Sequence, residues 1–142
     1  MIDRFLYEKS VTYQECLIIP FVYSHVDRQK IYSYVLLSEQ GYTSILHQAE
    51  NPAKLYSNDL PDIIAIAQQH IDTQVTLEGS NYFRQRYTYD RNLIIIHQEA
   101  NKCFYDHYPP NRLTNIAAPR IFDSPVDCVE WVKSGLKRNR TN

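Results

Sequence analysis

Glycine is scarce in this chain, and its scarcity excludes the common phosphate-binding loops. Only three glycines occur among 142 residues, Gly41, Gly79 and Gly135. A G-x-x-x-x-G-K-[ST] loop and a G-x-G-x-x-G turn both need glycines at much closer spacing. The chain also has no G-x-S-x-G elbow, no H-E-x-x-H helix and no D-x-[DN]-x-[DN]-G calcium loop. The sequence therefore excludes nucleotide binding through those loops and carries no recognised catalytic motif.

Cysteine and long apolar runs are equally limited. Cys16, Cys103 and Cys128 are widely spaced and form no C-x-x-C pair, which argues against a disulfide framework and against a structural zinc site. The longest apolar runs, residues 16–22 and 93–96, are far shorter than the roughly 20 residues that a membrane-spanning helix needs. Charged residues interrupt the N-terminal segment, as they do not in a secretion signal. We expect a soluble cytoplasmic protein with no metal, no cofactor and no membrane contact.

Charge is nearly balanced over the whole chain but differs between its halves. The formal net charge is -1, and 44% of the residues are hydrophobic, a composition typical of one folded domain. Residues 1–74 hold five basic and nine acidic side chains, net -4, whereas residues 75–142 hold ten and seven, net +3. This balance does not indicate a general polyanion-binding protein. The split between the halves would let two copies attract each other head to tail.

The chain contains internal near-copies that predict a repeated unit. Residues 54–57 (Lys-Leu-Tyr-Ser) and 120–123 (Arg-Ile-Phe-Asp) share a basic-aliphatic-aromatic-polar pattern, and each stands before a predicted helix. A second pair lies fifty residues apart, at 46–51 (Leu-His-Gln-Ala-Glu-Asn) and 96–101 (Ile-His-Gln-Glu-Ala-Asn). Repeated supersecondary units constrain a fold even where no motif identifies its chemistry. We predict one domain, residues 1–142, made of two similar halves at about 15–72 and 81–136.

Each half reads as three strands followed by a helix. Runs rich in β-branched and aromatic residues predict strands at 16–23, 31–37 and 42–47, and then at 82–89, 93–98 and 103–108. Pro20 cannot donate a ladder hydrogen bond, so we expect the first strand at a sheet edge or with a bulge. The predicted fold is α+β, with an antiparallel sheet built from two tandem βββα units and both helices packed on one face.

The helix starts carry clear capping signals. Asp59 and Ser124 are good N-caps, with a proline following in the first turn and an aspartate three residues after the cap. Apolar residues then recur at helical spacing, which predicts one buried stripe on each helix. The residues expected to face the core are Ile63 and Ile66 in the first helix and Val126, Val129 and Val132 in the second.

The best catalytic candidates surround the last predicted hairpin. Cys103, Asp106 and His107 lie on one strand, and His97 lies on its predicted antiparallel neighbour. A thiol beside an imidazole can act as a nucleophile, and two histidines with an aspartate can hold a divalent metal. A free cysteine on a strand is more often a small core residue. These four residues are therefore weak candidates for a thiol- or metal-dependent enzyme.

A second candidate site lies on the strand predicted at 82–89. Alternation places Tyr82, Arg84 and Arg86 on one face of this strand, opposite Phe83 and Tyr87. Bases stack on aromatic rings while arginine neutralises phosphates, so this face could hold single-stranded nucleic acid. The alternative is an ordinary solvated strand whose arginines pair with neighbouring acids.

Twelve tyrosines suit a recognition surface, because tyrosine offers a large contact area and keeps a polar tip. The hypothesis that follows is a small non-catalytic binding or regulatory module that recognises a protein partner through an aromatic-rich sheet face or an edge strand. Pairing of two copies through the edge strand at 16–23 would give a homodimer. Nucleic-acid binding and a thiol- or metal-dependent enzyme are the alternatives.

Overall fold

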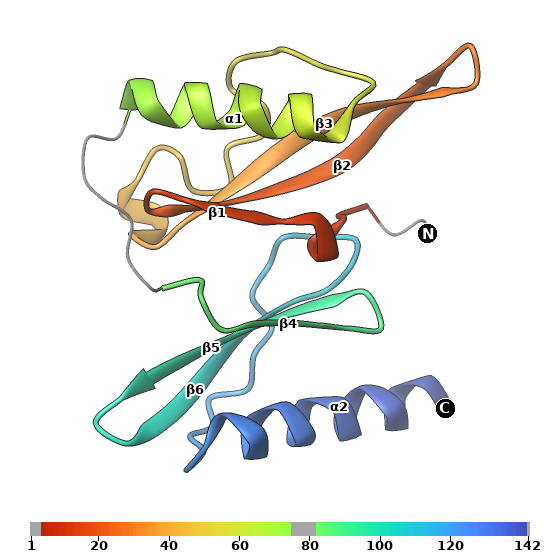
Figure 1. The fold of residues 1–142 in the computed structure, drawn as a ribbon. Helices are drawn as coiled ribbons and strands as arrows, with labels where there is room; N and C mark the ends of the chain where they lie inside the picture. The colour runs from red at the N-terminus through yellow and green to blue at the C-terminus, as the bar shows by residue number, and fades with distance from the viewer. Residues whose placement is uncertain (1–3, 75–81, 142) are drawn as a thin grey trace.

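The computed structural model describes residues 4–74 and 82–141, which form two βββα units (Figure 1). The first unit holds β1 (Val11–Tyr13), β2 (Cys16–Val26), β3 (Gln29–Ser38) and α1 (Leu60–Gln74). The second holds β4 (Arg86–Tyr89), β5 (Asn92–Glu99), β6 (Lys102–Tyr108) and α2 (Pro125–Thr141). Each set of strands is an antiparallel meander, in the order β1-β2-β3 and β4-β5-β6. The predicted α+β class with two tandem βββα units is confirmed.

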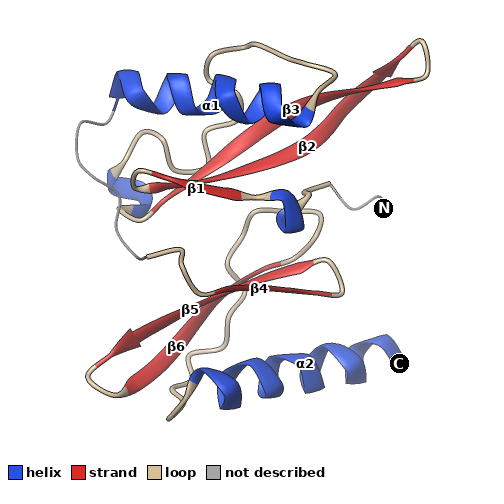
Figure 2. Ribbon diagram, in the orientation of Figure 1, coloured by secondary structure: helices blue, strands red, loops and turns tan. Residues whose placement is uncertain are grey.

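The strands form two separate sheets rather than one, and the helices cover opposite sides of the molecule (Figure 2). The reason lies in the strands, which are apolar on both faces. One buried cluster joins the sheets, a second packs β2 and β3 against α1, and a third packs β5 and β6 against α2. The joining cluster includes Leu17, Ile19, Leu37, Leu93 and Ile95. The order of layers is therefore helix, sheet, sheet, helix.

The first unit starts earlier in the chain than predicted. The segment 42–47 is not a strand: a short 3-10 helix, η2 (Gly41–Thr43), is followed by turns. Gly41 has a φ of +57°, a left-handed conformation that turns the chain out of β3. The third strand of this sheet is instead β1, which pairs with β2 on the side away from β3. The β-branched and aromatic residues of β1 lead through a tight turn at Gln14 into β2.

β2 is the central strand of its sheet, so the prediction of an edge strand at 16–23 is wrong. Pro20 is tolerated there because it lies opposite Tyr34, whose C=O points away from β2 and accepts from the Asn51 N–H at 2.9 Å. Pro20 therefore occupies a pair without ladder hydrogen bonds, and its missing N–H removes no bond to β3. On its other side β1 has already ended, since β1 pairs only as far as Ile18. The predicted bulge is present nearby, between Val22 and Ser24.

The two helix starts are confirmed. The Asp62 N–H donates to the Asp59 carboxylate at 3.0 Å, and the Asp127 N–H donates to the Ser124 hydroxyl at 3.1 Å. Two residues before each cap the chain makes an isolated bridge to the third strand, at Ser57 in the first unit and at Phe122 in the second. The segments 54–57 and 120–123 thus both join the chain before a helix to the third strand. The bridging residue is the fourth of the first segment but the third of the second.

The other pair of near-copies is not structurally equivalent. Residues 46–51 lie in the loop after β3, whereas residues 96–101 form the end of β5 and its turn. The two segments have similar sequences over six residues but different surroundings in the fold, and they therefore adopt different structures.

The helix faces agree with the prediction in part. Ile63 and Val132 are buried, while Ile66 and Val129 are half-buried against the same clusters. Val126 is 68% exposed, so its predicted inward position is wrong. The stripe that faces the sheet runs through Cys128 instead, four residues before Val132. No helix in the described part of the chain is both long and apolar enough to cross a membrane.

Candidate functional site

A hollow lies where β4 ends before its neighbour β5 does. β4 pairs with the first four residues of β5, and one further hydrogen bond joins the Ile96 N–H to the Gln85 C=O at 2.9 Å. Before Gln85 the chain leaves the sheet, whereas β5 continues to Glu99 and pairs there with β6. The end of β5 therefore has β6 on one side and no strand of the described chain on the other (Figure 1).

The backbone of Gln98 faces this gap. A two-residue turn with positive φ follows β5, so Glu99 and Lys102 form a hydrogen-bonded pair and the next pair, Gln98 with Cys103, does not. The Cys103 backbone confirms this alternation, because its N–H and C=O point outward and bond Phe122 at 2.8 and 2.7 Å. The N–H and C=O of Gln98 accordingly point to the position that a longer β4 would occupy. Within residues 4–74 and 82–141 neither group has a backbone partner.

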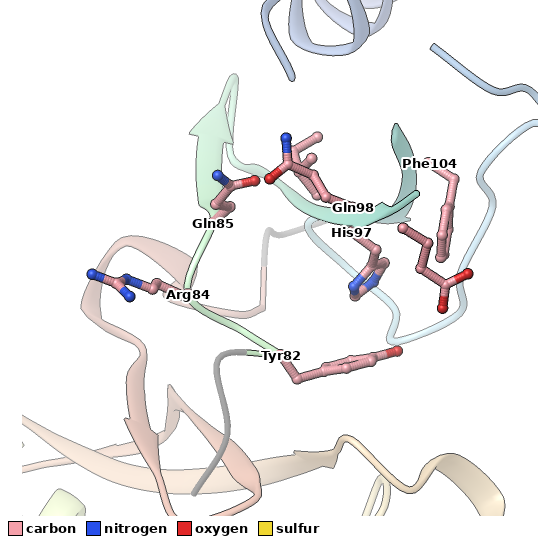
Figure 3. A pocket seen from close by; sticks show the side chains of 8 residues that line it. Tyr82, Arg84, Gln85, His97, Gln98 and Phe104 are labelled. Carbon is pink, nitrogen blue, oxygen red and sulfur yellow. The ribbon is translucent and has the colours of Figure 1, made fainter. Parts of the chain in front are cut away.

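Three aromatic rings line the hollow beside this edge (Figure 3). The ring centroids of Tyr82 and His97 are 4.4 Å apart, and those of His97 and Phe104 are 5.2 Å apart. His97 lies directly opposite Phe104 in the β5–β6 register, while Tyr82 comes from the segment before β4. The hollow has a volume of about 690 Å³, in the size range of ordinary ligand pockets. Tyr82 and Phe104 remain 38% and 37% exposed, so a ligand can reach both rings.

Ile96 and four polar side chains form the rest of the lining. Gln85 and Gln98 contribute carboxamides, Glu99 a carboxylate and Arg84 a guanidinium. Figure 3 shows the Arg84 side chain directed away from Tyr82, His97 and Phe104. The Lys102 ammonium, opposite Glu99 on β6, is 2.9 Å from the Asp123 carboxylate instead. Of the two charged residues that line the hollow, Glu99 and Arg84, the basic one is therefore turned away from the rings.

His97 is fixed from behind by a carboxylate. Its Nε2 lies 2.9 Å from the Asp106 Oδ2, and the Asn115 side-chain amide donates to Asp106 Oδ1 at 2.9 Å. His97 is only 8% exposed, so its ring is held rigidly between Tyr82 and Phe104. An imidazole oriented by a carboxylate is the arrangement of a general base. Cys103, the one predicted nucleophile, lies on the other face of the sheet.

The four predicted catalytic residues are divided between the two faces of their sheet. His97 and Asp106 lie on the face toward the first unit, because they alternate with residues of the cluster under α2. Cys103 and His107 lie on the face toward α2, where His107 Nε2 is 2.9 Å from the Asn92 side-chain oxygen. The prediction missed this because Gln98, and not His97, lies opposite Cys103 in the β5–β6 register. The side chains of His97 and Cys103 therefore project from opposite faces of the sheet. No thiol–imidazole pair is formed among these four residues.

All three cysteines are buried and unpaired, as predicted for Cys103 and Cys128. Burial raises the pKa of the Cys128 thiol to about 11, with a smaller contribution from Cys103. Burial also lowers the pKa of His107. These shifts favour the neutral forms of a thiol and an imidazole, so this layer behaves as a packed core.

Arg86 does not share an exposed face with Tyr82 and Arg84. Its guanidinium donates to the Phe83 C=O at 2.8 Å and to the Ser10 C=O of the first unit at 3.5 Å, and burial lowers its pKa. The strand predicted at 82–89 begins only at Arg86, because Phe83 enters the cluster between the sheets and bends the chain. Tyr82 and Arg84 do line one hollow, but without the strand alternation that suggested them.

A smaller hollow of about 300 Å³ adjoins the other side of Tyr82 and Asp106, at the junction of the two units. His47 lines it, and its Nδ1 accepts a hydrogen bond from the Ser38 N–H at 3.1 Å. Burial lowers the pKa of His47, and it raises that of Glu39 nearby. Nothing in the residue pattern singled out His47, since the loop that carries it was predicted as a strand.

The described residues contain no group of three or more histidine, cysteine or acidic side chains placed to hold a metal ion. Sequence reasoning also missed Phe104 and Gln98. Phe104 was detectable, because it alternates with Asp106 on the strand face that carries Tyr108. Gln98 was not, since its role follows from the length of β4.

No protein-family model matches this chain, and neither a curated protein nor a solved structure matches it. The geometry of the hollow is thus the basis for assigning a function.

Proposed function

We propose that this protein is a non-catalytic binding module that recognises a protein partner by adding an extended segment of that partner to the exposed end of β5. The observation that supports it most is the backbone of Gln98, which has no backbone partner among the described residues and lies beside an aromatic hollow. Strand addition uses backbone groups for affinity and adjacent pockets for specificity. Residues 97–99 of β5 provide both the backbone groups and part of the adjacent pocket.

The central sheet faces and the outer edges of β3 and β6 are less suitable. The other sheet or a helix covers most of both faces of each sheet, so the proposal places the aromatic surface beside the end of the second sheet, where Tyr82 and Phe104 are exposed. The outer edge of β3 is bridged by Glu50 and Ser57, and that of β6 by Phe122. These bridges occupy outward backbone groups that a partner strand would need.

A proline variant tests the proposal directly. Gln98→Pro removes the outward N–H but no backbone hydrogen bond to β6, since the backbones of Gln98 and Cys103 form a pair without ladder hydrogen bonds. It also removes the hydrogen bond from the Gln98 side-chain amide to the Cys103 Sγ at 3.6 Å. We expect the fold to remain and the affinity for partner peptides, selected from a displayed library, to fall about tenfold, the effect of a lost backbone hydrogen bond and a steric block.

Thr88→Pro is the matched control. By the same alternation its N–H also points away from β5, but Thr88 does not line the hollow. Circular dichroism and thermal unfolding establish that both variants are folded. Equal affinity of wild type and Gln98→Pro for every selected peptide would refute strand addition at β5.

Single-stranded nucleic acid is a second candidate, because Tyr82 and Arg84 line the same hollow. Arg84→Glu should then abolish the salt-sensitive binding of a fluorescent oligonucleotide, and Arg86→Met should not, since Arg86 bonds backbone carbonyls. We expect no salt-sensitive binding by the wild type, and that result would exclude this candidate. The thiol-enzyme alternative predicts rapid labelling of Cys103 at neutral pH; we expect slow labelling, because Cys103 is buried.

We further propose a cytoplasmic location, in keeping with three unpaired cysteines. We propose a homodimer through β2 only at the end of this strand that β1 does not cover. β1 covers Cys16–Ile18, whereas the hairpin beyond Val22 has no β1 partner and exposes Tyr23. Light scattering at increasing protein concentration tests the dimer.

A further inference from the structure

We propose that the side chain anchored in the aromatic hollow is a cation, the lysine or arginine of the partner segment. This inference rests on strand addition at β5 and goes further by assigning the chemistry that the hollow selects. It follows from the exposed ring faces, the sign of the charge around them and the register of an added strand.

The rings offer cation–π contacts. Tyr82 and Phe104 are each more than one third exposed, and His97 holds them in place from between. A lysine or arginine head group within about 6 Å of an aromatic centroid is attracted by the ring, more strongly where water is partly excluded. An apolar side chain would also contact these rings, so the charges must decide between the two.

The charges around the rings are mainly acidic. Glu99 lines the hollow, and the lysine across from it, Lys102, is engaged by Asp123 at 2.9 Å. Within the described chain Glu99 forms no ion pair. Asp106 adds a second carboxylate behind His97. Burial raises the pKa of Tyr82 most, and the negative charges of Asp106 and Glu39 raise it further.

The nearby basic groups do not cancel this potential. Arg84 points away from the rings (Figure 3), and Arg86 is bonded to the carbonyls of Phe83 and Ser10. A phosphate in the hollow would face Glu99 and Asp106 without an arginine directed at it. The charge distribution therefore favours a cationic peptide over a nucleic acid.

The register of an added strand places the cation. A residue paired with Gln98 projects its side chain toward the α2 side, as Gln98 does. Its neighbours in the added strand project toward the face that carries His97 and Phe104. The anchoring lysine or arginine thus lies next to, and not at, the position opposite Gln98.

A series of host peptides tests the inference. Extended peptides of roughly nine residues, rich in threonine and valine, carry lysine, arginine, norleucine or glutamate at one central position. We expect the lysine and arginine peptides to bind about tenfold more tightly than norleucine, and glutamate to bind most weakly. Fluorescence anisotropy at low and high salt measures the affinities, and added salt should reduce the difference between lysine and norleucine.

Protein variants identify the source of the preference. Glu99→Gln and Phe104→Leu should each reduce the preference for lysine over norleucine several-fold, while Glu130→Gln, an exposed acid on α2, should leave it unchanged. Equal affinity of the lysine and norleucine peptides, both weakened by Gln98→Pro, would overturn the cation preference and leave strand addition standing. Binding of none of the peptides, or binding unaffected by Gln98→Pro, would count against strand addition itself. Oligonucleotide binding that depends on Arg84 would overturn both.

Discussion

The cluster between the two sheets should make both units unfold together, and Leu17→Ala tests this. Leu17 lies on β2 in the first unit, is fully buried, and packs in the cluster that also holds Leu93 and Ile95 of the second unit. A buried leucine cut to alanine costs about 3 kcal/mol through lost burial and a residual cavity. If the chain is one cooperative domain, this loss destabilises the second unit as much as the first.

The expected shift is large enough to measure with confidence. The entropy of unfolding is about 2.1 cal/mol/K per residue, so a chain of 142 residues has roughly 0.3 kcal/mol/K. A loss of about 3 kcal/mol then lowers the midpoint by roughly 10 °C. Ile45→Ala, an aliphatic truncation at a side chain that is 83% exposed, should leave the midpoint nearly unchanged.

The single tryptophan makes the assay specific to one unit. Trp131 lies in the layer of α2, near Phe122 and Arg120, so its fluorescence reports on the second unit alone. Far-ultraviolet circular dichroism reports on both units. We expect Leu17→Ala to lower the two midpoints equally. A Trp131 transition that stays at the wild-type temperature while circular dichroism shows an earlier phase would refute the single cooperative domain.

Two further predictions concern stability. Ser124→Ala removes the cap hydrogen bond to the Asp127 N–H and should lower the free energy of unfolding by about 1 kcal/mol, whereas Ser124→Asp should retain it, as denaturant unfolding would show. Burial lowers the pKa of both His47 and His107, so the unfolded chain binds more protons than the folded one below the ordinary histidine pKa of about 6.5. Stability should therefore fall as the pH decreases from about 7 to 5, and His107→Asn should flatten that dependence; an unchanged profile in the variant would contradict the assignment.

The secondary structure of the second unit was largely readable from the sequence because its signals are local. The apolar run at 93–96, the turns around it and the cap at Ser124 each act within a few residues. The first unit was read less well. The segment 42–47 has strand-like composition, but Gly41 turns the chain away, and Leu46 reaches the core while Ile45 is exposed. Strand propensity shows only which conformations a segment tolerates, and the packing of Leu46 against α1 determined the conformation of this loop.

The sequence by itself determined the α+β class, the two βββα units, the helix starts and the burial of the cysteines. Alternation and capping are local properties that a chain carries in its residue order. Only the tertiary structure decided that the strands divide into two sheets facing each other, because strands that are apolar on both faces can be covered equally well by a helix or by another sheet. It also separated His97 from Cys103, assigned Arg86 to backbone carbonyls, and left the backbone of Gln98 exposed beside three rings. These outcomes depend on register and on strand length, and a shift of one residue in register exchanges the faces of a strand.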